Sequence, residues 1–123
     1  MRLFILTILS FVLISAQTNE SKRTESEAKK LIDSLYAKVK SGEDFAIIAN
    51  RYSEDSGTKG KGGKYEPFKQ GTFNIEFENV VVNLSLNEIS KPFKSPYGYH
   101  IAQLLAIQGD YYTVRHILIK FQN

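Results

Sequence analysis

Residues 114–120 of the chain read VRHILIK, and this stretch decides how the rest folds. It is apolar and rich in β-branched side chains, which is typical of a buried strand. It carries His116, and His100, the only other histidine, lies sixteen residues earlier in the similar stretch SPYGYHI, residues 95–101. The sequence therefore predicts two neighbouring strands that each carry one imidazole.

The spacing of these strands predicts a hairpin over residues 98–107 and 111–121, joined by the sequence Gln-Gly-Asp at residues 108–110. Side chains along a strand alternate between the two faces of the sheet, so the register decides which residues share a face. A three-residue loop pairs Ile107 with Tyr111 and makes the two histidines diagonal neighbours on one face, about 7–8 Å apart. A two-residue loop sends them to opposite faces.

Composition favours one domain whose core relies on packing. The 123 residues include no cysteine, so no disulfide can stabilise the fold. The formal net charge is only +3, which argues against a nucleic-acid partner. Four lysines surround a glycine-rich loop and are expected to be solvated: Lys59, Lys61, Lys64 and Lys69.

The first residues resemble a secretory signal peptide. Arg2 precedes an apolar run over residues 3–14, and the small residues Ser-Ala follow at the expected cleavage site. About fourteen helical residues span about 21 Å, less than the roughly 30 Å of a hydrocarbon core, so a stable membrane anchor is not expected. We expect a signal peptide at residues 1–16, a flexible leader at 17–23, and a folded domain at 24–123 that is exported to the periplasm or outside the cell.

Three segments have the apolar spacing of helices. The first begins at the capping box Thr24-x-x-Glu27 and ends at Gly42, the second has the Glu-Asp pair of residues 43–44 in its first turn, and the third covers residues 74–84. Their inward positions are expected to be Ala28, Leu31, Ile32, Leu35 and Val39, then Phe45, Ile48, Ala49 and Tyr52, and finally Phe77, Val80, Val81 and Leu84.

The remaining segments predict a loop and two edge strands. Residues 53–64 contain four glycines and no apolar side chain, so they predict a surface loop. Residues 65–68 and 89–94 each contain a proline, which suits a short edge strand. Together these elements predict an α+β fold, with a four-stranded antiparallel sheet flanked by three to four helices.

The order of motifs along the chain resembles that of the parvulin-type peptidyl-prolyl cis/trans isomerases. The motifs are Gly42-x-x-Phe45, Ala49-x-x-Tyr52-Ser53-Glu54-Asp55, Gly62-Gly63, Phe68-x-x-Gly71, Glu76-Phe77, NEISKPF at 87–93, YGYHI at 97–101 and RHIL at 115–118. The resemblance implies a parvulin/FKBP-like fold and isomerisation of X-Pro bonds in exported folding proteins. It implies no cofactor, and it implies unfolded or folding proline-containing polypeptides as partners.

The position of the RHIL motif departs from the family, in which this strand comes first and lies inside the sheet. Here it comes last. Circular permutation explains the change, because a hairpin at residues 108–110 can deliver the final strand antiparallel into the same place. The alternative is a fragment whose last strand belonged to a second domain. Permutation predicts a monomer, whereas an unpaired strand predicts a strand-swapped dimer.

The resemblance also implies the residues of the site. Asp55 would face the substrate carbonyl, and His100 and His116 would orient a hydrogen-bond network beneath it. The substrate-binding residues would be Tyr65, Phe68, Phe73, Phe77 and Tyr97. Residues 64–68, KYEPF, depart from the Asp-Leu-Gly run that is common in the family. The alternative function is therefore a catalytically weak, polypeptide-binding chaperone module on the same fold.

Other chemistries lack their motifs. Gly57 and Gly62 are spaced like the start of a P-loop, but Gly63 stands where the lysine is needed. A metal site would need a carboxylate such as Asp55 or Asp110 beside the histidines, and no spacing enforces this. A serine hydrolase would need a Gly-x-Ser-x-Gly turn, which the chain lacks.

Overall fold

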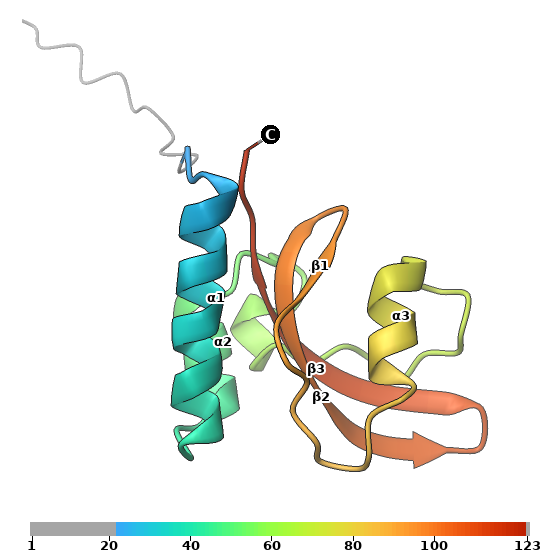
Figure 1. Ribbon diagram of the computed structural model, residues 1–123. Helices are drawn as coiled ribbons and strands as arrows, with labels where there is room; N and C mark the ends of the chain where they lie inside the picture. Colours follow the sequence, from blue (N-terminus) through green and yellow to red (C-terminus); the bar gives the residue numbers. More distant parts are fainter. Residues whose placement is uncertain (1–21, 123) are drawn as a thin grey trace, which may run out of the picture.

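The computed structural model describes residues 22–122, so the predicted signal peptide and residues 17–21 of the leader lie outside the described residues. The elements follow in the order α1 (Glu25–Lys40), α2 (Phe45–Tyr52), the 3-10 helix η1 (Lys59–Lys61), α3 (Ile75–Val81), β1 (Phe93–Ser95), β2 (Gly98–Gln108) and β3 (Tyr111–Ile119) (Figure 1). This mixed α+β architecture confirms the predicted fold class. Every helix within residues 22–122 is too short or too polar to span a membrane.

The three α-helices begin where the sequence predicts. Thr24, Asp44 and Asn74 are the N-caps, and each side chain accepts a hydrogen bond from the backbone N–H three residues later. The third helix ends at Val81, earlier than the predicted residue 84. Its β-branched valines disfavour continuation, and the chain leaves the helix through a tightened turn in which Leu84 N–H bonds Val81 O at 3.4 Å.

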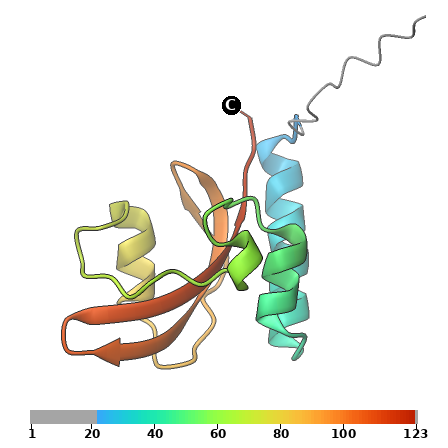
Figure 2. The same cartoon turned by 180° about the vertical axis from the view of Figure 1, so that it is seen from behind.

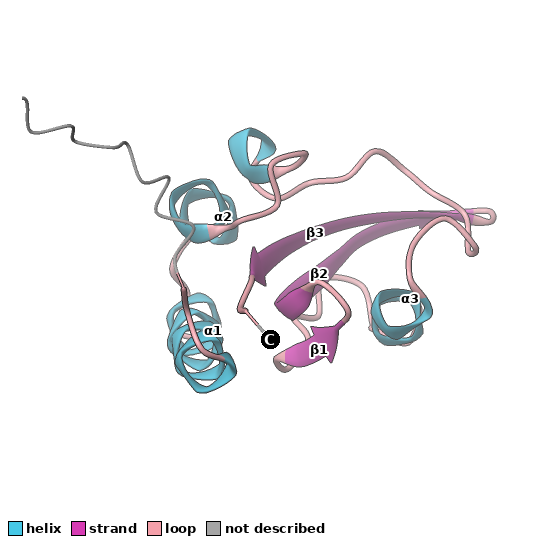
Figure 3. Cartoon of the chain, turned by 90° about the horizontal axis from the view of Figure 1, so that it is seen from above, coloured by secondary structure: helices cyan, strands magenta, loops and turns pink. Residues whose placement is uncertain are grey.

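Helices cover both faces of the sheet. On one face, Ile101, Ile117 and Ile119 pack against the buried sides of α1 and α2. On the other face, Phe77 and Val81 of α3 pack against a second apolar cluster from β2 and β3. Seen from above, the sheet separates α1 and α2 from α3 (Figure 3). Both faces of each long strand are therefore covered. A one-residue change of register would move the side chains of one face to the other.

The hairpin loop has two residues, so the predicted three-residue loop is wrong. Gln108 pairs with Tyr111, which leaves Gly109 and Asp110 as the loop. Gly109 has a φ of +58°, which fits the first central position of a type II′ turn, the kind that matches strand twist.

A β-bulge then restores the predicted register. The pairing shifts by one residue between Leu104 and Ala106, so that His100 pairs with Leu118 and Ala102 pairs with His116. The predicted pairing of the histidine region is therefore confirmed, although its cause is the bulge and not the loop length.

β3 is at the edge of the sheet, whose strand order is β1-β2-β3, so the expectation that the final strand lies inside the sheet is wrong for the described residues. One edge pairs with β2, and the other edge is followed by the segment between α2 and α3, which Figure 2 shows running alongside β3. Along this edge His116 N–H bonds Gly63 O at 2.9 Å and Tyr65 N–H bonds Val114 O at 3.1 Å. At the end of β3, Gln122 N–H donates to Arg23 O, so the two ends of the described part lie together. The circular permutation requires this closeness and stays a prediction.

Within residues 22–122 the sheet has three strands, so the predicted count of four is wrong. Residues 65–68 form no strand, and two isolated bridges at the ends of this segment pair Lys64 with Arg115 and Phe68 with Tyr112. Pro67 has no N–H to donate between them, so no ladder forms. β1 is likewise only Phe93–Ser95, because Pro92 precedes it.

Residues 53–64 are largely at the surface, as their polarity predicts, but four of them are buried against the fold. Ser53, Thr58, Gly62 and Gly63 are buried. Ser53 Oγ accepts a hydrogen bond from Leu118 N–H at 3.2 Å, and Glu54 N–H donates to Leu118 O at 2.8 Å. The segment is polar because it supplies the hydrogen-bond partners of an exposed strand edge, and such groups are buried without penalty when they are paired.

Gly63 lies directly against the backbone of β3, so Gly63→Ala should destabilise the fold. A Cβ atom here would lie 2.2 Å from His116 O, and the φ of +81° is unfavourable for alanine. We expect urea denaturation to show a loss of about 3 kcal/mol in the free energy of unfolding. Gly60→Ala is the control, since its Cβ meets nothing within 4 Å. Equal stability of the two variants would contradict the close approach.

Candidate functional site

The two histidines face each other across β2 and β3. His100 Nδ1 and His116 Nδ1 lie 3.2 Å apart, and the rings stack with a 5.5 Å centroid distance and a 22° angle. Both side chains are buried. The prediction that they share one face of the sheet is confirmed.

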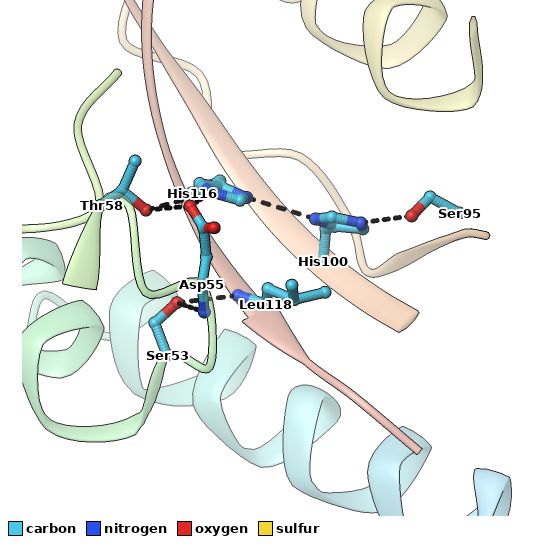
Figure 4. A network of polar contacts seen from close by, with 7 residues as sticks. All are labelled: Ser53, Asp55, Thr58, Ser95, His100, His116 and Leu118. Carbon is cyan, nitrogen blue, oxygen red and sulfur yellow. Dashed lines mark hydrogen bonds and ion pairs between the residues drawn. The ribbon is translucent and has the colours of Figure 1, made fainter. Parts of the chain in front are cut away.

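A chain of polar contacts extends from the histidine pair in both directions (Figure 4). At one end, Ser95 Oγ lies 2.6 Å from His100 Nε2. At the other end, His116 Nε2 lies 2.9 Å from Asp55 Oδ2, to which Thr58 Oγ1 also donates. The network therefore ties β1, β2, β3 and the segment after α2 to one carboxylate.

The contacts assign the protons when both rings are neutral. Asp55 accepts, so His116 Nε2 carries a hydrogen, which leaves His116 Nδ1 to accept from His100 Nδ1–H. His100 Nε2 then accepts from the Ser95 hydroxyl, while Ser95 Oγ accepts from Tyr97 N–H at 3.1 Å. Each hydrogen bond in this chain of contacts then has one donor and one acceptor, and each group donates to the next one in the direction of Asp55.

The surroundings of the site keep the Asp55 carboxyl ionised and the His100 ring neutral. The hydrogen bond from His116 holds the pKa of the Asp55 carboxyl well below its usual range, against the opposing effect of partial burial. Burial lowers the pKa of His100 to about 3, so this ring is neutral near pH 7. Burial and the nearby Asp55 carboxylate raise the pKa of Tyr65, so its phenol stays protonated. The site therefore presents the ionised carboxylate of Asp55 together with a neutral His100 and a protonated Tyr65 phenol.

A cavity of about 340 Å³ opens above this network. Seven of the eight predicted site residues line it: Asp55, Tyr65, Phe73, Phe77, Tyr97, His100 and His116. Phe68 is the exception. It is buried behind Phe73, with an edge-to-face centroid distance of 4.7 Å, and supports the wall from outside.

Aromatic rings form the walls of the cavity. Tyr65 stacks on His116 at 4.7 Å and packs against Phe73 at 4.5 Å. Phe77 meets both imidazoles edge-on, at 5.6 Å from His100 and 5.4 Å from His116. Such rings form a rigid apolar pocket suited to a small apolar ring of a ligand.

Several site residues were not predicted. Thr58 and Ser95 belong to the polar network, and four further residues line the cavity: Thr72, Asn74, Leu118 and Lys120. Thr58 follows Asp55 by three residues, a spacing typical of a side-chain-capped turn, so a local signal existed. Lys120 and Asn74 reach the cavity only through the tertiary fold.

Glu78 is a further unpredicted residue that positions the site. Its carboxylate is 4% exposed and accepts hydrogen bonds from Gly71 N–H and Phe73 N–H, both at 2.6 Å. These bonds tie the loop before α3 to the helix itself. Phe73 is thereby held against Tyr65.

The imidazoles and the carboxylate of the site are engaged in hydrogen bonds with one another and with Ser95. Within residues 22–122, no group of three or more histidine, aspartate or glutamate side chains is arranged to hold an ion. All four imidazole nitrogens of His100 and His116 already face hydrogen-bond partners. Metal ligation would require the network to break.

Comparison with known proteins relates the chain to a group of folding factors. Residues 6–108 match the model of the PPIC-type PPIase domain. Chaperone SurA of Pseudomonas fluorescens is 41% identical over 83 residues, which are 68% of this chain and 20% of that protein. Foldase protein PrsA 4 of Bacillus cereus is 43% identical over 76 residues, 62% of this chain and 27% of that protein. The chain thus spans between a fifth and about a quarter of these relatives.

Solved structures show the same likeness. The peptidylprolyl isomerase PrsA of Bacillus anthracis superposes with a TM-score of 0.56 at 27% identity, covering 80% of this chain and 37% of that one. PrsA of Bacillus cereus gives a TM-score of 0.53 at 33% identity, over 81% of this chain and 32% of that one.

His100 should make stability depend on pH. The folded protein leaves this ring neutral down to about pH 3, whereas the unfolded chain binds a proton below about pH 6.5. Stability is therefore complete above about pH 6.5 and is lost as the pH falls. Between pH 7 and pH 5 we expect a loss of about 2 kcal/mol in the free energy of unfolding, measured with urea.

His100→Gln should remove most of this loss. The stability that the low pKa of Asp55 contributes is present above about pH 4 and falls away only below it, outside the measured window. An unchanged pH dependence in the variant would contradict the assignment of a neutral, buried His100.

Proposed function

The chain belongs to the PPIC-type PPIase domain family, the parvulin type of peptidyl-prolyl isomerase, and from this premise we propose that it isomerises X-Pro bonds in exported polypeptides as they fold. The observation that carries the proposal is the aromatic cavity with one ionised carboxylate at its base. The proposed catalytic site consists of Asp55 together with His100 and His116, which position it. Tyr65, Phe73, Phe77 and Tyr97 are proposed to bind the proline, with Phe68 supporting them.

The reaction breaks no covalent bond. The planar peptide bond has resonance between the carbonyl and the nitrogen, and rotation out of the plane meets a barrier of about 18–20 kcal/mol. A site that binds the twisted form better than the planar form accelerates rotation, and about 5 kcal/mol of such preference is worth between three and four decades in rate. No cofactor is needed for this chemistry.

The aromatic walls account for proline recognition. Phe73, Phe77 and Tyr65 pack against one another with centroids 4.5–6.0 Å apart and form a wall of the cavity, on which an apolar pyrrolidine ring can pack. Holding this ring still leaves the preceding carbonyl as the part that rotates. The binding free energy of the proline is then used to orient the amide.

Asp55 would act on the rotating carbonyl. In the planar amide, resonance places negative charge on the oxygen, and a nearby carboxylate in a poorly hydrated cavity repels it. Twisting removes that resonance and returns electron density to the nitrogen. The carboxylate therefore disfavours the planar state more than the twisted one, which is the differential interaction that catalysis requires.

The histidines are assigned to positioning Asp55. His116 Nε2–H holds the carboxylate at 2.9 Å, and His100 holds His116 in the required tautomer. No proton has to move during rotation, so a fixed direction of hydrogen bonds serves better than a mobile one.

We propose unfolded or folding, proline-containing polypeptides as partners and export as the location. The relatives named chaperone and foldase support this partner class, and the resemblance of residues 1–16 to a signal peptide supports export. We propose a monomer, because both edges of β3 pair within the same chain and leave no strand to exchange.

An exchange measurement on a proline peptide tests the function. NMR exchange between the cis and trans forms of an uncharged Ala-Pro peptide should accelerate at least about a hundredfold with the full chain present, relative to peptide alone. Binding of unfolded chains without any acceleration would reject the enzyme and favour the chaperone module.

Asp55→Asn should lower kcat/KM at least about tenfold, because the amide keeps the shape of the side chain and removes its charge. KM should change little, since the proline pocket is intact. Asp33→Asn is the matched control: this exposed carboxylate on α1 pairs with Lys29 and is outside the cavity. Equal kcat/KM in Asp55→Asn and the wild type would remove Asp55 from the mechanism.

A further inference from the structure

A second hollow adjoins the proline cavity. It has a volume of about 290 Å³ and shares three lining residues with the cavity, namely Tyr65, Thr72 and Phe73. Tyr65 and Phe73 pack at 4.5 Å, so they form a common wall with the cavity on one side and the hollow on the other. A polypeptide that places a proline in the cavity meets the hollow as soon as it crosses this wall.

The lining of the hollow combines apolar surface with positive charge. Pro67 and Phe68 contribute apolar surface, which gives Phe68 a place beside substrate although it lies outside the proline cavity. Lys61 and Lys64 also line it, together with a single acidic side chain, Glu66. The charged residues that line the hollow thus have a net charge of +1.

These lysines are available to a ligand. Lys61 and Lys64 are exposed, and none of the ion pairs formed within residues 22–122 includes either of them. Glu66, the carboxylate nearest in sequence, forms no ion pair with either lysine. The next nearest are engaged elsewhere, since Asp55 bonds His116 and Glu54 pairs with Arg23. Lys59 and Lys69, which do not line the hollow, add to the positive potential of the same segment.

We propose that this hollow binds acidic side chains of the substrate on one side of the proline. The inference rests on the proposed function for its substrate and adds a specificity to it. An extended chain advances about 3.3 Å per residue, so the acidic residues should lie about two to four positions from the proline. Binding on only one side is expected, because the hollow adjoins only one wall of the cavity.

The experiment compares peptides of equal length with one central Ala-Pro bond. Three glutamates or three lysines are placed two to four positions before or after the proline, and NMR exchange with the full chain gives kcat/KM for each. We expect the acidic peptide to exceed the basic one at least about fivefold on one side only. The ratio should fall toward one when the ionic strength is raised from about 0.05 M to about 0.5 M.

The double substitution K61Q/K64Q should bring the acidic-to-basic ratio on that side close to one. Lys59→Gln is the matched control: it removes one charge from the same loop but none from the lining, and it should leave the ratio within about twofold of wild type. A ratio near one in the wild-type protein would overturn the proposal. A loss of preference in Lys59→Gln as large as in K61Q/K64Q would also overturn it, because it would show a general charge effect.

The uncharged peptide separates this inference from the proposed function. If that peptide is not accelerated, the isomerase proposal fails while the hollow is still tested by amide chemical shifts. Shifts at Lys64 and Thr72 on addition of the acidic peptide, absent in K61Q/K64Q, would support acidic binding on their own. Shifts of equal size with the basic peptide would exclude it.

Discussion

The one-residue register shift between Leu104 and Ala106 is the constraint on which this structure depends. Near the turn, the two-residue loop fixes one pairing register between β2 and β3. The bulge shifts this register by one residue before the strands reach the histidines, which changes the face on which each side chain of β3 lies relative to β2. Beyond the bulge, Ile101 and Ile117 face α1 and α2, whereas His100 and His116 face α3. Without the shift, β3 would present His116 and the three positions Ile117, Leu118 and Ile119 to the wrong layers, and neither the core nor the site could form.

The edge of β3 that does not pair with β2 connects the core to the candidate site. Backbone groups of Leu118 bond Ser53 and Glu54, and this pairing sets Asp55 directly beside the strand that carries His116. The polar segment after α2 therefore acts as the partner of a buried strand and as the source of the carboxylate. Since the same hydrogen bonds do both, the stability of this edge and the position of the charge are coupled.

Features that depend on local interactions could be predicted from the sequence, whereas features that depend on long-range contacts could not. The N-caps Thr24, Asp44 and Asn74 act through hydrogen bonds within one turn, so the helix starts follow from the sequence alone. The bulge at residues 104–106 has no composition signal, because it depends on how two strands and their layers fit together. The burial of Ser53 and Thr58 was missed for the same reason. Polar side chains are expected to be exposed to solvent unless the strand edge that supplies their hydrogen-bond partners is known. Most of the predicted site residues line the cavity. They could be predicted because the family resemblance reflects tertiary contacts that the spacing of residues alone does not reveal.

The arrangement of the network explains why a site of this kind can work without moving a proton. Ser95, His100, His116 and Asp55 lie on three strands and a loop, so each hydrogen bond joins two elements that are already held by the core. A carboxylate fixed in this way cannot turn to follow a substrate, and any reorganisation would cost the hydrogen bonds behind it. In the proposed mechanism, a bound amide therefore adapts to the field of Asp55, and the planar and twisted forms differ most in the charge on the oxygen near it. On that proposal, rigidity of the polar network and selectivity for the twisted amide are two consequences of one geometry.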